Sequence, residues 1–274
     1  MNRARRRLSR SVARSRWGEY RGLLETARGS GYRAVSLEEW IGSPEPAAAP
    51  TLVLRHDVDE HPRSALAMAR IEESLGLRST FYFRWRTAHQ AVIGALRERG
   101  FAVGLHYETL SRRVLALGLD PEDDLSRLVD ESRDVLRREI AAFAERFGPI
   151  RSICAHGDSR VPHVRNSLLL RGQDWSSFGI DYEGNEAMAG RDLGCWLTDR
   201  SAPEGRWRDG LEPAELFASR TSPILCLTHP NNWASGTGLW MDRGLRTALS
   251  LLDPLTGGVR LVRPIRSRTD EPPL

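Results

Sequence analysis

The chain has 274 residues, of which 40 are arginine and 36 are acidic, and it contains no lysine, so its formal net charge is +4. Hydrophobic residues make up 40% of the chain and charged residues 28%, which is typical of a globular protein and excludes a disordered or fibrous one. No run approaches the roughly 18–20 apolar residues that cross a bilayer, so we expect no transmembrane segment.

The excess positive charge lies at the start of the chain. Residues 1–16 carry seven arginines and no acid, and the remaining residues comprise 33 basic and 36 acidic ones. We therefore expect a basic tail and no nucleic-acid partner. No apolar run follows the arginines, so the pattern is neither a secretory nor a twin-arginine signal and favours a cytoplasmic protein, although it also resembles a transit peptide. Arginine without lysine indicates a GC-rich, bacterial coding sequence.

The three cysteines indicate a reducing environment. Cys154, Cys195 and Cys226 are odd in number, widely spaced and set in apolar runs. This pattern fits neither a disulfide framework nor a CxxC metal site, so we predict buried free thiols.

Strands and helices are predicted to alternate along most of the chain. Residues 17–40 form an amphipathic segment, and the proline-rich stretch 43–50 is a linker. The predicted elements then follow in chain order: strand 51–58, helix 62–75, strand 79–85, helix 88–99, strand 101–107, helix 121–148, strands 151–155, 177–182, 195–197 and 224–228, helix 239–252 and strand 258–265. Repeated βα units predict an α/β protein with a parallel sheet covered by helices, and this length favours a barrel over an open sheet, although periodicity alone does not decide between them.

The same pattern divides the chain into regions. We predict a basic tail at 1–16, a helical segment and linker at 17–50, one barrel domain at 51–266 and a short tail at 267–274. The long helix at 121–148 is well marked, because Pro121 opens it, acids precede arginines along it, and Gly148 ends it.

Four polar clusters come where an apolar strand pattern ends. They are His56-Asp57-Val58-Asp59, His106-Tyr107-Glu108, His156-Gly157-Asp158 and His229-Pro230. In an α/β barrel the carboxyl ends of the strands converge on one face, and active sites lie there. A single Asp-x-Asp is often a solvated turn and a single histidine often structural, so the shared position of the clusters is what indicates a site.

The residue types in these clusters favour a metal. Asp57 and Asp59 are two residues apart, so their carboxylates point to the same side of an extended chain. Together with His106 and His156, one of them completes the three protein ligands of a catalytic divalent-metal site, for which zinc is a good fit. The other carboxylate would then accept a proton, and His229 would protonate a leaving group.

The remaining histidines are predicted to lie outside the site. His56 points away from the face that carries the two carboxylates, so we interpret it as structural. His61, His89 and His163 are predicted to lie at the surface.

Four segments resemble the polysaccharide deacetylase (NodB-homology) family, and more closely its bacterial branch whose first motif reads LRHDVD. They are Leu54-Arg55-His56-Asp57-Val58-Asp59, Ser79-Thr80-Phe81-Tyr82-Phe83, Gly104-Leu105-His106-Tyr107 and Leu227-Thr228-His229-Pro230. The resemblance covers residues 51–233. It implies a distorted (β/α) barrel and metal-dependent hydrolysis of an N-acetyl, sometimes O-acetyl, group on a sugar.

The resemblance also implies roles for individual residues. The first acid of the first motif is the family's general base, which is Asp57, and the second binds the metal, which is Asp59. The first histidine of the second motif is a metal ligand, here His106. The histidine of the last motif is the general acid, here His229.

The chain departs from the family pattern at two places. The second motif usually supplies another histidine four residues after the first, where this chain has Leu110, and the third motif, with an arginine and a proline, is not visible. His156 stands near the place of that motif, so we predict that it is the third ligand. Alternatively His229 or Glu108 binds the metal, or no metal is bound.

Five residues are predicted to contact substrate: Tyr107, Glu108, Asp158, Asp199 and Trp233. Trp233 would stack on a sugar ring or else belong to the core or a lid, and Asp199 would bind a hydroxyl or else end a turn. We therefore expect a metal-dependent deacetylase of an N-acetylated amino sugar or a related small glycoside, and its partner is a small-molecule or oligosaccharide substrate. The alternatives are a metal-free sugar-binding or regulatory protein and a hydrolase of another linear amide. The oligomeric state is left open.

Overall fold

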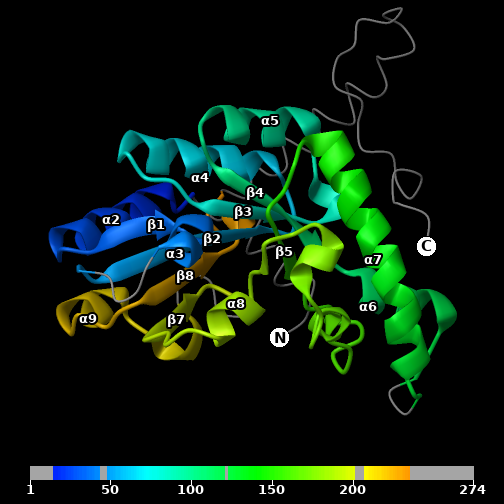
Figure 1. Cartoon of the computed structure of the whole chain (residues 1–274). Coiled ribbons are helices and arrows are strands. Elements are labelled where there is room, and N and C mark those ends of the chain that lie inside the picture. The colour runs from blue at the N-terminus through cyan, green and yellow to red at the C-terminus, as the bar shows by residue number, and fades with distance from the viewer. Residues whose placement is uncertain (1–14, 44–47, 121–122, 201–206, 235–274) are drawn as a thin grey trace, which may run out of the picture.

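The computed structural model describes residues 15–43, 48–120, 123–200 and 207–234 (Figure 1). The predicted helix at 239–252 and the predicted strand at 258–265 lie outside these residues, as do most of the basic tail and the C-terminal tail. Within the described part, no helix is long and apolar enough to cross a membrane.

The described strands form one parallel sheet of eight strands that curls into a half-barrel. Their order is β6-β5-β4-β3-β2-β8-β7, and β1 pairs with the first half of β2. The strands are β1 Arg33–Ser36, β2 Thr51–Val58, β3 Thr80–Phe83, β4 Ala102–Tyr107, β5 Ser152–Ala155, β6 Tyr182–Glu183, β7 Cys195–Thr198 and β8 Ile224–Thr228. The expected α/β barrel-type fold is therefore confirmed.

Helices cover both sides of the sheet. They are α2 Trp17–Gly29, α3 Leu37–Gly42, α4 Arg63–Ser74, α5 Gln90–Glu98, α6 Thr109–Leu117, α7 Ser126–Phe147, α8 Glu186–Ala189 and α9 Pro213–Ala218. Helices α9, α2, α4, α5, α7 and α6 contact one another in succession along one side (Figure 1). The short helices α3 and α8 pack against the other side, where Trp40 and Met188 join Val53 and Tyr82 in an apolar cluster.

Alternation along β2 decides which side chains reach the site. Leu52 and Leu54 face the helices and pack in one cluster with Tyr20 of α2, and each such buried side chain contributes about 1.5–3 kcal/mol. His56 follows on the same side, and its Nε2 lies 2.7 Å from Glu72 Oε1 of α4. The structure thus directs His56 away from the two aspartates, as predicted. Arg55 and Asp57 point to the opposite side of the strand.

The predicted strand at 177–182 is wrong over most of its length. Asp174 accepts a hydrogen bond from the backbone N–H of Ser176 at 3.0 Å and starts a 3-10 helix at Trp175–Phe178. Gly179 then adopts a left-handed φ of 72°, and only Tyr182 of the predicted range belongs to β6. Local side-chain hydrogen bonds compete with strand pairing, and here they prevail.

The predicted N-terminal segment contributes a strand as well as helices. Helix α2 is followed by β1, which pairs with β2 from Arg33 to Ser36. Ser36 then accepts a hydrogen bond from the backbone N–H of Glu39 at 3.0 Å and so caps α3. Helix α6, which was not predicted, is followed by Gly118, whose left-handed φ of +65° is common after a helix C-terminus.

Candidate metal and catalytic site

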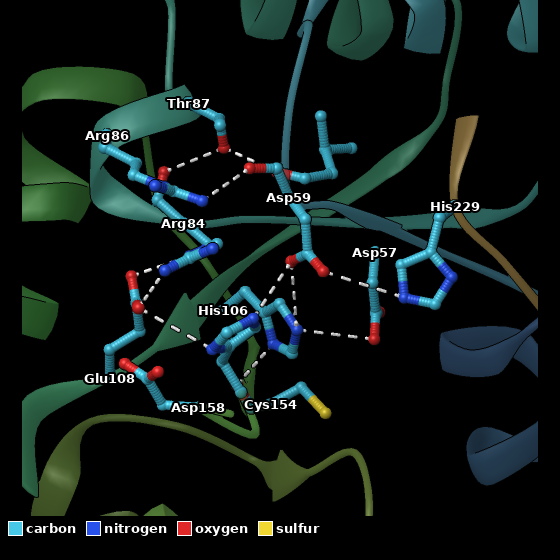
Figure 2. A network of polar contacts seen from close by, with 12 residues as sticks. Asp57, Asp59, Arg84, Arg86, Thr87, His106, Glu108, Cys154, Asp158 and His229 are labelled. Carbon is cyan, nitrogen blue, oxygen red and sulfur yellow. Dashed lines mark hydrogen bonds and ion pairs between the residues drawn. The ribbon is translucent and has the colours of Figure 1, made fainter. Parts of the chain in front are cut away.

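The predicted polar clusters meet at the carboxyl ends of the parallel strands. Asp57 belongs to β2 and Asp59 follows it, His106 belongs to β4, His156 follows β5, and His229 follows β8. Figure 2 shows the carboxylate of Asp59 between His106 and His229. Residues far apart in the sequence are adjacent because every strand runs in the same direction.

Asp59, His106 and His156 form a cluster whose spacing fits a metal ion. One ligand atom from each lies within 4.8 Å of the others. Asp59 Oδ1 lies 3.7 Å from His106 Nε2 and 3.5 Å from His156 Nε2. Zinc–ligand bonds near 2.1 Å would place two tetrahedral ligand atoms roughly 3.4 Å apart. The three side chains therefore stand close to the separation that one small cation requires.

The protonation of the cluster also fits a cation. The Cys154 carbonyl oxygen lies 2.9 Å from His106 Nδ1, so Nδ1 must donate and Nε2 presents a lone pair towards Asp59. Burial lowers the pKa of His106 to about 4, despite the opposing charges of Asp57 and Asp59, and keeps the ring neutral at pH 7. Asp59 Oδ1 is buried and has no hydrogen-bond partner, which is costly for a carboxylate oxygen unless a cation binds it.

Asp59 is ionised even though it is largely enclosed. Burial opposes its charge, but the contact with His156 and the neighbouring His106 and His229 lower its pKa well below the usual range. An anionic oxygen beside two imidazole nitrogens is a donor set that suits zinc and similar divalent ions.

Leu110 takes no part in this cluster. It is fully buried and packs in the apolar core between the sheet and the outer helices. The histidine that completes the cluster comes instead from the end of β5, at His156, whose backbone N–H donates to the carbonyl of Tyr107 at 2.9 Å.

Asp57 is held by Arg55, a residue that was not among the predicted site residues. The Arg55 guanidinium donates to both carboxylate oxygens, at 2.9 and 2.8 Å, and to Asn185 at 2.8 Å. Burial opposes ionisation of Asp57, but Arg55 outweighs it and lowers the pKa to about 2. Asp57 Oδ2 lies 3.4 Å from His106 Nε2, so its charge faces the cluster. The sequence does contain a pattern that indicates this pair, because Arg55 precedes Asp57 by two residues and shares its face of β2.

His229 is oriented by Asp199. Its Nδ1 lies 2.7 Å from Asp199 Oδ1, and its Nε2 lies 3.7 Å from Asp59 Oδ2. Burial would lower the pKa of His229, but Asp199 and the two site aspartates raise it to about 9. The ring is therefore a cation at neutral pH, and Nε2 holds a proton beside the cluster.

Asp199 and Trp233 do not occupy the positions expected of substrate contacts. Asp199 accepts hydrogen bonds from the backbone N–H of His229 and, at 2.9 Å, from Trp233 Nε1. Trp233 is only 2% exposed and packs with Tyr20 in the core. Asp199 therefore orients the histidine, and Trp233 holds Asp199 in place through its indole N–H.

Tyr107 and Glu108 also point elsewhere than expected. Tyr107 is fully buried in the core between sheet and helices. Glu108 forms a buried ion pair with Arg84, and its Oε1 lies 3.6 Å from His156 Nδ1. Glu108 thus lies behind His156. Of the five residues predicted to bind substrate, only Asp158 lines the pocket described next.

A pocket of about 940 Å³ opens beside the cluster. Asp59, His156 and His229 line one part of it, and residues 157–160 with residues 162 and 164–167 form much of the remainder. This volume is near the upper end of the roughly 300–1,000 Å³ of ligand sites. The cluster and the proton of His229 are therefore open to a small molecule.

No family model matches the chain, and no curated protein matches its sequence. Among solved structures, a CE4 family pseudoenzyme from Bacillus anthracis is 15% identical with a TM-score of 0.42. The match covers 75% of this chain and 61% of the pseudoenzyme chain. A mutant of this pseudoenzyme with restored enzymatic activity is 14% identical with a TM-score of 0.43, and the match covers 72% of this chain and 62% of the mutant chain. A family 4 carbohydrate esterase from Streptomyces lividans in complex with acetate is 14% identical with a TM-score of 0.39, and the match covers 72% of this chain and 89% of the esterase chain. The chain thus spans less than two thirds of the length of the first two, and the likeness is distant.

Proposed function

We propose that this protein is a metal-dependent hydrolase that removes the acetyl group from an N-acetylated amino sugar. The observation that carries the proposal is the position of a protonated histidine opposite a three-residue metal cluster. Asp59, His106 and His156 would hold a divalent ion such as zinc, and His229 Nε2 faces the same carboxylate from the other side. A bound metal ion would supply Lewis-acid activation of water and of the amide carbonyl.

The protein's own residues supply the proton transfers. Hydrolysis of an acetamide consumes one water and produces acetate and an amine, so a proton must leave the water and another must reach the nitrogen. Asp57 accepts the first at Oδ2, which faces the cluster, and His229 donates the second from Nε2. Asp199 stabilises the protonated ring through Nδ1, and Arg55 keeps Asp57 ionised and fixed. General acid–base steps of this kind contribute roughly 10²–10⁴-fold each.

The test combines metal analysis with a chemical assay. Purified protein would be compared with Asp59→Asn and His156→Asn variants, and with His163→Asn as the matched control, since His163 is exposed and outside the cluster. We expect about one zinc ion per chain in the wild type and in His163→Asn, and loss of the ion from the other two. Acetate release from N-acetylated amino sugars should follow the metal content.

Two results would contradict the proposal. Wild-type protein that binds no divalent ion would favour a metal-free sugar-binding or regulatory protein. Metal-loaded protein that releases no acetate from amino sugars, yet hydrolyses other linear amides, would support the metal site but contradict the proposed substrate.

A further inference from the structure

The pocket beside the metal cluster has an excess of positive charge. The arginines that line it are Arg84, Arg86, Arg160, Arg165 and Arg200, and the acids that line it are Asp59, Glu60 and Asp158. Arg84 is paired with Glu108, and Arg160 with Asp158. Asp59 belongs to the metal cluster. Among the described residues that line the pocket, three guanidinium groups therefore remain, with Glu60 alone to balance them.

Arg200 is the best placed of these three groups. It follows Asp199 at the end of β7, and Thr198 Oγ1 accepts a hydrogen bond from its backbone N–H at 3.1 Å. Its guanidinium lies against Gly157, so close that a Cβ at that position would collide with Nη2. Consecutive Cα atoms are about 3.8 Å apart, so the guanidinium touches the neighbour of His156, a metal-cluster residue.

Arg200 also lacks an acidic partner within the described residues. No carboxylate there lies within ion-pair distance of its exposed side chain. The same strand end therefore provides Asp199, which orients His229, and a cation directed at the pocket. Arg165 is likewise exposed and unpaired in the described part of the chain, and adds to the positive field.

The described lining of this pocket has no large aromatic side chain beyond its histidines. Among the described residues that line it, none is a tryptophan, tyrosine or phenylalanine. A neutral sugar ring is commonly held by stacking on such side chains, and Trp233, the predicted platform, is in the core. The described lining therefore offers charged groups and hydrogen-bonding groups for recognition.

We propose that the substrate carries an anionic group, a phosphate ester or a carboxylate, which Arg200 binds while the acetamide lies at the metal cluster. The inference rests on the proposed hydrolase function and specifies its substrate class. A guanidinium binds such groups through two parallel hydrogen bonds. The pocket of about 940 Å³ is large enough for an amino sugar with a charged substituent.

Calorimetric titration of the zinc-loaded protein tests this inference. The probes are glucosamine, glucosamine 1-phosphate, glucosamine 6-phosphate and muramic acid, which are already deacetylated and cannot be turned over. The variants are Arg200→Gln and Gly157→Ala, the second of which keeps the charge but displaces the guanidinium. Arg70→Gln is the matched control, because Arg70 is exposed on α4 and does not line the pocket.

We expect at least one anionic probe to bind roughly ten-fold or more tightly than glucosamine. Arg200→Gln should abolish this advantage, Gly157→Ala should reduce it, and Arg70→Gln should leave it unchanged. Added salt should weaken it, because Arg200 is exposed. Preference for the phosphates or for muramic acid identifies the anion.

Equal binding of charged and neutral probes, no binding of any probe, or a full advantage in Arg200→Gln would overturn the inference. Acetate release is measured separately on the N-acetylated forms. Selective binding of anions without acetate release would refute the proposed hydrolase function but support the anion-binding role of Arg200. Equally fast release from neutral and charged sugars would refute only the anion site.

Discussion

Replacing Asp199 with asparagine isolates the interaction that keeps His229 protonated. The carboxylate lies 2.7 Å from Nδ1, and the pKa of His229 stands near 9 against an ordinary value of about 6.5. At about 1.4 kcal/mol per pH unit, the difference corresponds to about 3 kcal/mol in favour of the charged ring. Asparagine preserves the size and an acceptor for Trp233 Nε1 but removes the charge. Burial, which lowers the pKa, then has less opposition, and we expect the pKa to fall by more than one unit.

Histidine NMR titration of metal-free protein measures this change directly, with His229→Asn to assign the signal. The sign for stability follows from linkage. A histidine whose pKa is raised on folding stabilises the protein fully below pH about 6.5, and the stabilisation is lost as pH rises through about 9. Wild-type stability should therefore decline over this range, and Asp199→Asn should flatten the decline. An unchanged pKa in the variant would refute the assignment of Asp199 as the residue that positions and charges His229.

Two further predictions concern the buried groups around the site. Arg55→Gln leaves Asp57 buried without its cation, so we expect the free energy of unfolding to fall by about 3–5 kcal/mol in urea denaturation. A loss below about 1 kcal/mol would contradict the ion pair. Cys154 and Cys226 are free and buried, and burial raises the pKa of both thiols. Both should therefore resist a thiol reagent in native protein and react after unfolding, and rapid labelling of either in the native state would count against their burial.

Elements with a strong local pattern were predicted accurately. The strand at 51–58 coincides with β2, and the strand at 224–228 coincides with β8. The second is an almost continuous apolar run and the first begins with one, and both are buried along their whole length, as expected for strands of a parallel sheet covered on both faces. The strand-end placement of Asp59, His106 and His156 followed from the same pattern, because parallel strands bring their carboxyl ends together.

Residues whose role depends on a distant partner were harder to assign. The sequence marks Asp199 only as an acid after a strand. Its partner His229 is thirty positions away and follows the adjacent strand β8. Trp233 could equally stack on a sugar or fill the core, and its contact with Tyr20 of α2 decided for the core. Neither contact has a local signature.

The sequence by itself determined that this is an α/β protein with acids and histidines gathered at one end of a parallel sheet, because strand periodicity and strand-end chemistry are local properties. Only the tertiary structure decided which of them are free to act. It paired Arg55 with Asp57, Glu108 with Arg84 and Asp199 with His229, and it left Asp59, His106 and His156 facing one another. The physical reason is that the charge state of a buried group depends on its neighbours in space, and these come from strands far apart in the chain.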